Sequence, residues 1–200
     1  MSSQKKNNEF WERYRGTIYS HVGGAVIGEG VVYSHGYSIL EELVGKASYF
    51  QLMVLNATGR LPDRALADWI EAAFMCVSWP DARIWCNTIG AFGGTLQSSA
   101  VAATAAGMLA ADSIMYGSLP LIEGVGFIQQ ALQDYLDGMS ADNIVEQQCA
   151  KHRGKPNIIG YARPLARGDE RLLAMEAVTE RLNFKIGAHL NLAYEIQSTL

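Results

Sequence analysis

The sequence predicts an all-α, multihelical protein with a short, irregular β-ribbon near its N-terminus. Three observations support this fold class. Apolar side chains recur at the three-and-one spacing of a helix face in several segments after residue 38. Glycines, prolines and capping residues stand at the ends of those segments. Residues 16–37 combine several glycines with β-branched and aromatic side chains, which favours a ribbon or loop.

The helices predicted in the first part of the chain follow from their end signals. Residues 38–45 (SILEELVG) and 47–59 (ASYFQLMVLNATG) each end at a glycine suited to a C-cap. Pro62 opens the next helix in the favoured first-turn position, with Asp63 beside it to meet the positive end of the helix dipole. Two helices follow, at 81–94 and 97–116. Small side chains dominate the second, so we expect it in the interior or at a subunit interface.

Residues 117–120 break this pattern, and more helices follow. Helical spacing resumes at Phe127, Ile128, Ala131, Leu132, Tyr135 and Leu136. Ser140 begins another helix that ends near Gly154, and two further helices are predicted at 170–182 and 186–198. We therefore expect a polar N-terminal tail at residues 1–15 and one helical domain at residues 16–200.

The composition excludes several classes of protein. Hydrophobic residues make up 49% of the 200 residues and charged residues 18%, which is incompatible with a mostly disordered chain. A net charge of -4 leaves no electrostatic footprint for nucleic acid or an anionic membrane. Polar residues and glycines interrupt the uncharged stretch 84–111, so we expect no membrane span there. With no secretory signal and three cysteines without CxxC spacing, a cytoplasmic protein is expected.

Common catalytic and metal-binding motifs are not found in the sequence. No pair among His21, His35, His152 and His189 has a recognisable metal-ligand spacing, so no metal site is predicted. His152 and His189 are interpreted as helix-end and helix-surface residues. There is no GxSxG, GxxxxGK[ST] or GxGxxG motif.

The segment 155–171 (KPNIIGYARPLARGDER) carries most of the functional signal. Lys155, Arg163 and Arg167 supply cations, and Gly160 exposes backbone donors, a combination that suits an anionic, phosphate-bearing ligand. The alternative is a solvated basic connector between helices. Charge alone favours the connector.

A set of collinear motifs resembles the citrate synthase and citryl-CoA lyase family. Residues 159–171 (IGYARPLARGDER) are similar to the family's PGFGHPxHxGDPR, and VVYSHGYSILEEL is similar to YRGYDIxEL. TGRLPDRAL matches the GxLPT element, and AATAAGMLAADSIMYG leads into LPLIEG as a small-residue helix leads into the family's first histidine motif. The resemblance spans residues 16–198. It implies an all-α homodimeric enzyme that makes or breaks a carbon-carbon bond beside an acyl-CoA thioester, with residues 138–182 resembling the small lobe.

Departures from the family motifs fall on the acid-base groups. Arg163 and Ala166 stand where the family has its loop histidines, and Ser118 or Pro120 stands at its other catalytic histidine. The family's chains continue past the position of Leu200, and that segment holds the aspartate that removes the α-proton. The resemblance therefore implies a shortened family member.

The remaining candidates for chemistry are few. Arg163 can donate to an enolate oxygen or clamp a carboxylate, but it stays protonated and cannot be a base. Glu123 and Asp169 are the carboxylates available as a base. Asp169 is expected to hold the loop, and Glu123 is either a site residue or an ordinary helix-start carboxylate. Ser118 is a catalytic candidate because either Ser118 or Pro120 takes the place of the family's other catalytic histidine.

The resemblance also implies where coenzyme A would bind. Residues Ile158, Ile159, Gly160, Tyr161 and Ala162 would line the site, with Lys155 or Arg167 near the phosphates. No bound cofactor is expected, since acyl-CoA would be the substrate. Three hypotheses remain: an enzyme with a rewired site acting on a thioester or carboxylate substrate, a catalytically degenerate binding or structural protein, and one subunit of a split enzyme whose partner supplies the missing aspartate.

Overall fold

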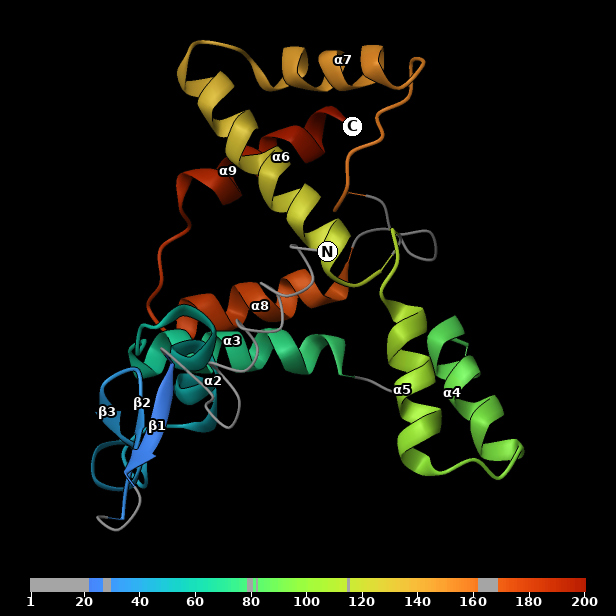
Figure 1. Ribbon diagram of the computed structural model, residues 1–200. Coiled ribbons are helices and arrows are strands. Elements are labelled where there is room, and N and C mark those ends of the chain that lie inside the picture. The colour runs from blue at the N-terminus through green and yellow to red at the C-terminus, as the bar shows by residue number, and fades with distance from the viewer. Residues whose placement is uncertain (1–21, 27–29, 79–80, 82, 115, 162–168) are drawn as a thin grey trace, which may run out of the picture. The chain divides into compact units, whose positions relative to one another are not determined.

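The computed structural model describes residues 22–26, 30–78, 81, 83–114, 116–161 and 169–200 (Figure 1). Helices dominate, with a small antiparallel sheet near the N-terminus, which confirms the predicted fold class. The chain divides into two compact units: the first is Met1–Met75 and the second is Cys76–Leu200. The predicted tail at residues 1–15 lies outside the described residues.

The predicted ribbon is a three-stranded sheet in the order β1-β2-β3. Strands β1 (Gly23–Val26) and β2 (Val31–Ser34) pair with Ala25 opposite Val32, and β3 (Tyr37–Ser38) returns along β2. The residues between β2 and β3, His35 and Gly36, have φ angles of 47° and 84°, as a two-residue hairpin turn requires. The ribbon also contacts the helix Tyr49–Thr58 through Ser34 Oγ, which donates to Asn56 Oδ1 at 2.7 Å.

The helix predicted at 38–45 is instead a single π-helical turn, η1 (Ile39–Leu43). Ser38 still belongs to β3, and its hydroxyl accepts a hydrogen bond from the Glu41 amide at 3.3 Å. The Val44 amide donates to the Ile39 carbonyl at 2.8 Å and closes the turn. The segment is shorter than predicted because strand pairing takes its first residue and Gly45, at φ 76°, ends it.

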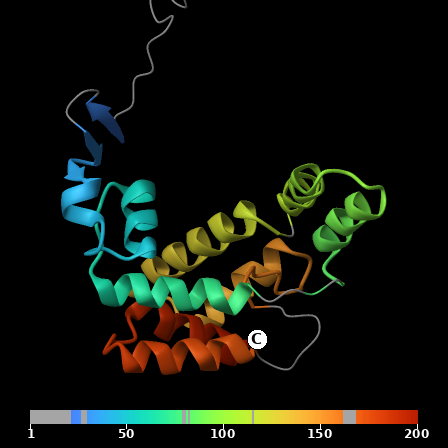
Figure 2. The ribbon, with the colours of Figure 1, turned by 90° about the horizontal axis from the view of Figure 1, so that it is seen from below.

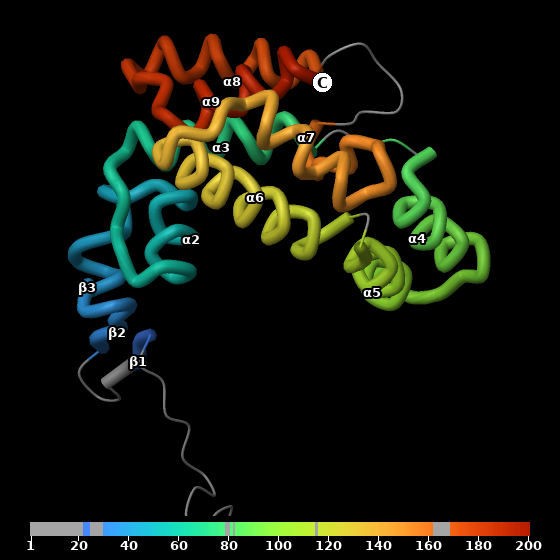
Figure 3. Tube along the Cα trace, turned by 90° about the horizontal axis from the view of Figure 1, so that it is seen from above, coloured from blue at the N-terminus to red at the C-terminus, as the bar shows by residue number. Residues whose placement is uncertain are grey.

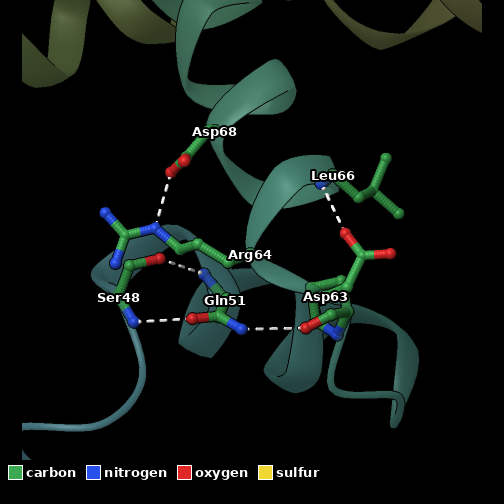
Figure 4. Close-up of polar contacts among 7 residues, drawn as sticks. Ser48, Gln51, Asp63, Arg64, Leu66 and Asp68 are labelled. Atoms are coloured by element: carbon green, nitrogen blue, oxygen red, sulfur yellow. Dashed lines mark hydrogen bonds and ion pairs between the residues drawn. The ribbon is translucent and has the colours of Figure 1, made fainter. Parts of the chain in front are cut away.

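Helix α2 (Tyr49–Thr58) ends as predicted at Gly59, which has a left-handed φ of 73°. Helix α3 (Arg64–Val77) begins later than Pro62. The carboxylate of Asp63 accepts from the Leu66 amide at 2.7 Å, so Asp63 is the cap and not a residue of the first turn (Figure 4). Pro62 lies outside the helix, where its carbonyl is used by a side chain of α2.

That side chain is Gln51, which joins the starts of α2 and α3 (Figure 4). Its Oε1 accepts from the Ser48 amide at 2.9 Å, and its Nε2 donates to the Pro62 carbonyl at 2.9 Å. The Gln51 amide donates to Ser48 Oγ at 3.2 Å, which completes a capping box. Gln51 is buried, so both ends of its amide are satisfied inside the first unit.

In the second unit, α4 (Trp85–Thr95) and α5 (Ala100–Ala111) form a helical hairpin (Figure 2). Close approach is confirmed, since a Cβ on Gly93 would lie 2.7 Å from Ala103 Cβ and one on Gly107 would lie 3.0 Å from the Cys86 carbonyl oxygen. The helix predicted at 97–116 is shorter because Ser99 caps its start, with Oγ accepting from the Ala102 amide at 3.2 Å. No residue of α5 is buried, so the expected interior position is wrong for the chain by itself.

The break in helical structure predicted at 117–120 is wrong for residues 118–120, because helix α6 (Ser118–Leu136) already begins at Ser118. Pro120 lies in the first turn of α6, where the proline's missing N–H leaves no helical hydrogen bond unmade. The turn before the helix is made by Gly117, at φ 87°. A Cβ there would lie 3.1 Å from the Ala111 carbonyl oxygen and 3.2 Å from Asp112 Cα, so only glycine fits without a shift.

The core of the second unit lies among α6, α7 (Ala141–Lys151) and α9 (Ala188–Thr199) (Figure 3). Ser140 caps α7 as predicted, and Asp169 caps α8 (Glu170–Arg181). The buried cluster consists of Ala131, Ile144, Val145, Ile158, Leu192 and Ile196. Phe127, Ile128 and Leu132 pack against this cluster, which confirms most of the apolar face predicted for α6. Tyr135 and Leu136, predicted on the same face, are exposed. Among the described helices, none is both long enough and apolar enough to span a bilayer.

Replacing Gln51 should destabilise the first unit. Gln51→Leu keeps the side chain's approximate size but leaves the Ser48 amide and the Pro62 carbonyl without their partner. We expect a loss of about 1–3 kcal/mol in the free energy of unfolding, measured by urea denaturation followed by circular dichroism. Gln130→Leu, which removes only an exposed bond to Asp134 on α6, is the matched control. Equal effects of the two substitutions would show that the Gln51 bridge contributes nothing.

Candidate functional site

The turn at residues 158–161 packs directly against α6. A Cβ on Gly124 would lie 3.7 Å from Ile159 Cγ2, an ordinary van der Waals distance, so the turn lies beside this position of α6. One helical turn later, the rings of Phe127 and Tyr161 meet edge to face, with centroids 6.4 Å apart and planes at 86°. The structure thus brings together two segments that the sequence motifs single out separately.

Ile158 anchors this turn. Its side chain is 6% exposed and belongs to the core cluster, so it faces the protein interior and is not open to a ligand. The Tyr161 amide donates to the Ile158 carbonyl at 3.4 Å, and Gly160 between them adopts a φ of 97°. Ile159 is half-buried, and Gly160 and Lys155 are exposed. Of the predicted lining residues that the structure describes, Ile159, Gly160 and Tyr161 therefore present atoms outside the core.

Tyr161 has an unusual polar atom. Its hydroxyl oxygen is buried, and no group of the described residues forms a hydrogen bond with it. Burial raises the pKa of the Tyr161 phenol above its ordinary value, because the charged phenolate is poorly solvated there. The phenol is therefore protonated at neutral pH and carries an O–H that is available as a hydrogen-bond donor.

Asp169 and Arg171 form a second feature at the start of α8. Asp169 Oδ1 accepts from the Arg171 amide at 3.0 Å and from Nε at 2.7 Å, and Oδ2 accepts from Nη2. The Arg171 side chain is 37% exposed. Hydrogen bonding to Asp169 is the main reason that the pKa of Arg171 is raised, and the charges of Asp169, Glu170 and Tyr116 add to it. Asp169 thus caps α8 and orients a guanidinium, and neither of its oxygens is free to act as a simple base.

The amino end of α6 completes the described part of the site. Ser118 is its first residue, and Gly117 before it has no side chain to cap the helix. Ser118 and Glu123 are both exposed. Tyr116 lies just before this helix and near enough to Arg171 to affect its pKa, so the guanidinium and the start of α6 occupy the same region of the second unit. The positive end of the α6 dipole and Arg171 both favour an anion.

Arg171 was not predicted as a site residue, although it ends the GDER segment that resembles the family motif. The spacing could have indicated its role, because an arginine two residues after a helix-capping aspartate can pair side-on with that carboxylate. Arg163, Ala162 and Arg167 lie outside the described residues. Their predicted roles stay predictions, as do those of Lys155, Glu123 and Ser118.

Other polar groups do not extend the site. His152 ends α7 and His189 lies on α9, and both are exposed. Within the ranges that the structure describes, no three His, Cys, Asp or Glu side chains are grouped to hold a metal ion. An open depression lies at the carboxyl end of α6, lined in part by Tyr135, Asp142 and Glu195. Because the polar groups of this depression pair with one another, as when Thr199 Oγ1 donates to Asp142 Oδ1 at 3.0 Å, the start of α6 is the better candidate site.

Neither protein-family models nor curated protein sequences match the chain. Solved structures do. Citryl-CoA lyase from Hydrogenobacter thermophilus superposes with a TM-score of 0.76 at 22% identity, covering 91% of this chain and 67% of that one. ATP citrate lyase from Methanothrix soehngenii, in complex with citrate and coenzyme A, has a TM-score of 0.78 at 14% identity, covering 99% of this chain and 31% of that one.

A variant of Methanosaeta concilii ATP citrate lyase in complex with (3S)-citryl-CoA is similar at a TM-score of 0.75 and 14% identity, again covering 99% of this chain and 31% of the other. This chain thus spans about a third of the length of the ATP citrate lyase chains. At these identities the likeness establishes the architecture. The chain has the fold of citryl-CoA lyase, which confirms at the level of the fold the resemblance that its motifs carry.

Proposed function

We propose that the chain binds a carboxylate-bearing substrate and a coenzyme A thioester, and takes part in forming or cleaving the carbon-carbon bond beside that thioester. The observation that carries this proposal is that, in one unit, the turn at 158–161 packs against α6 and Arg171 interacts electrostatically with Tyr116, just before that helix. These are the segments whose motifs resemble the citryl-CoA lyase family. The ligands named for the structural neighbours, citrate, coenzyme A and citryl-CoA, have the charges that this region favours.

Arg171 is the described residue best suited to hold a substrate carboxylate. Asp169 fixes the guanidinium through Nε and Nη2, which leaves its Nη1 end for a second anion. Because Asp169 has already restricted the side chain, a bound carboxylate loses less rotamer entropy than it would with a free arginine. A citrate-like ligand would also gain from the uncapped start of α6.

Bond cleavage in such a ligand has defined requirements. A base removes the proton of the hydroxyl group, the carbon-carbon bond breaks as the new carbonyl forms, and the bonding electrons pass to the thioester as an enolate. A donor must stabilise the enolate oxygen before a proton returns to carbon. Arg163 is our candidate donor and Glu123 our candidate base, while Asp169 orients Arg171.

The state of the carboxylates favours a second candidate function. Both oxygens of Asp169 are used by Arg171, and Glu123 is exposed on α6 without the burial that tunes a catalytic acid. A binding protein, or one subunit whose partner chain supplies the base, would retain the ligand site and lack chemistry alone. Ligand binding without turnover, restored to turnover by a second chain, would distinguish this function from a complete enzyme.

A homodimer is also proposed, formed through the α4–α5 hairpin. Residues 84–111 carry no charge, and Val101 and Leu109 are 80% and 78% exposed. Phe92, Leu96 and Met108 are exposed on the same hairpin. Two identical uncharged surfaces meet without like-charge repulsion, and apolar surface of this extent is typical of a protein interface.

Binding of citrate and short acyl-CoAs tests the proposed function. Calorimetric titrations of citrate, coenzyme A and acetyl-CoA should each give a binding isotherm, and no heat at millimolar ligand would remove the proposal. Arg171→Lys keeps the charge but loses the planar guanidinium, so the Kd for citrate should rise about tenfold or more. Arg181→Lys, in the last turn of the same helix, is the matched control and should leave the Kd unchanged.

Arg163 has a separate prediction, because it stands at the matched histidine position. If the chain turns over a substrate, Arg163→Lys should reduce turnover on the order of a hundredfold with folding unchanged. Arg163→His should not restore citrate chemistry, since the other matched histidine positions are still occupied by Ser118 or Pro120 and by Ala166. Full activity of Arg163→Ala would place the active site elsewhere.

The dimer is tested by multi-angle light scattering. The wild-type chain should elute with twice its 21.8 kDa mass, and Val101→Glu should elute as a monomer because the interface would bury an unpaired carboxylate. Ala106→Leu, also exposed on α5, should weaken the dimer by about 1–3 kcal/mol through overpacking. Leu40→Glu, exposed in the first unit, is the control. A monodisperse wild-type monomer would contradict the proposed interface.

A further inference from the structure

Among the described residues of the second unit, the Tyr161 hydroxyl is buried and has no hydrogen-bond partner. Native folds rarely leave a buried donor without an acceptor, because its hydration is lost and nothing replaces it. The aromatic contact with Phe127 uses only the ring, and packing against the core cluster does too. A phenylalanine would keep these contacts without the cost, so the fold itself gives no reason for the hydroxyl.

The position of Tyr161 suggests what the hydroxyl is for. The residue lies on the turn that packs against α6, three residues after the buried anchor Ile158 and directly after Gly160. Protonated at neutral pH, it can donate one hydrogen bond in surroundings with little water, where such a bond to an oxygen is strong. This role needs no proton transfer, because the proton stays on the phenol while the hydroxyl donates the hydrogen bond.

We propose that the Tyr161 hydroxyl donates a hydrogen bond to an oxygen of the bound acyl group, either the thioester carbonyl or a carboxylate. This inference rests on the proposed function, because it needs a ligand with an acyl group at this site. It adds a residue that the motifs predicted only to line the site. In bond cleavage or formation, the same donor would hold the oxygen on which negative charge develops.

Tyr161→Phe tests the proposal in two independent measurements. The first is thermal unfolding without ligand. Removing an unsatisfied hydroxyl should raise the Tm, whereas Tyr194→Phe, which removes a hydroxyl bonded to Glu176, should not. A lower Tm for Tyr161→Phe would show that the hydroxyl has a partner within the fold, and would overturn the proposal before any ligand is added.

The second measurement compares the calorimetric Kd values of citrate, acetyl-CoA and coenzyme A. If the acceptor is the thioester carbonyl, Tyr161→Phe should weaken acetyl-CoA roughly tenfold and leave coenzyme A unchanged. If it is a carboxylate, citrate should weaken by a similar factor and both coenzyme A ligands should not. Tyr194→Phe should bind all three as the wild type does.

The outcomes separate this inference from the proposed function. Wild-type binding together with unchanged binding by Tyr161→Phe would overturn the role of Tyr161 and leave the proposed function standing. Equal losses for coenzyme A and acetyl-CoA would place the hydrogen bond on the coenzyme portion and overturn the acyl assignment. No binding of any ligand by the wild type would overturn both.

Discussion

Burial of Ile158 in the core formed by α6, α7 and α9 is the interaction on which the candidate site depends. Asn157 before Ile158 is exposed and Ile159 after it is only half-buried, so Ile158 is the apolar anchor that holds this irregular segment against a rigid helix. Ile159 lies beside Gly124 of that helix, and Phe127 meets the ring of Tyr161 one helical turn later. Without that anchor, Gly160 and the Tyr161 hydroxyl would have no defined position relative to α6, and a ligand would have to order them at its own entropic cost.

The electrostatics of the site follow from a division of roles between neighbouring residues. The carboxylate of Asp169 caps α8 and accepts hydrogen bonds from the Arg171 side chain, which orients that guanidinium. The described region therefore favours binding of anions more clearly than removal of protons. This is the physical reason that a complete enzyme and a binding subunit both remain candidate functions, and that ligand binding is the property they share.

In the α4–α5 hairpin, small residues lie between the two helices and large apolar residues lie on the outer surface. Gly93, Ala103 and Gly107 bring the two helices into close contact, so little of their surface is left for larger side chains between them. Val101, Leu109 and other large apolar residues consequently lie on the outside of the hairpin. The composition that suggested an interior helix thus produces an exposed apolar surface on the chain alone, a surface suited to covering by another protein chain.

Features that depend on residues close together in the sequence were predicted well. Gly59 ends α2, Ser140 begins α7 and the segment from Glu170 is helical, because caps and helical spacing act over three or four residues. The fold class was also predicted at this level. The tertiary structure decided what depends on distant partners. Strand pairing shortened 38–45 to one π-helical turn, and the tight turn at Gly117 let α6 start at Ser118. Packing among helices far apart in the sequence put Ile158 in the core and left the Tyr161 hydroxyl without a partner among the described residues, and no local pattern records either outcome.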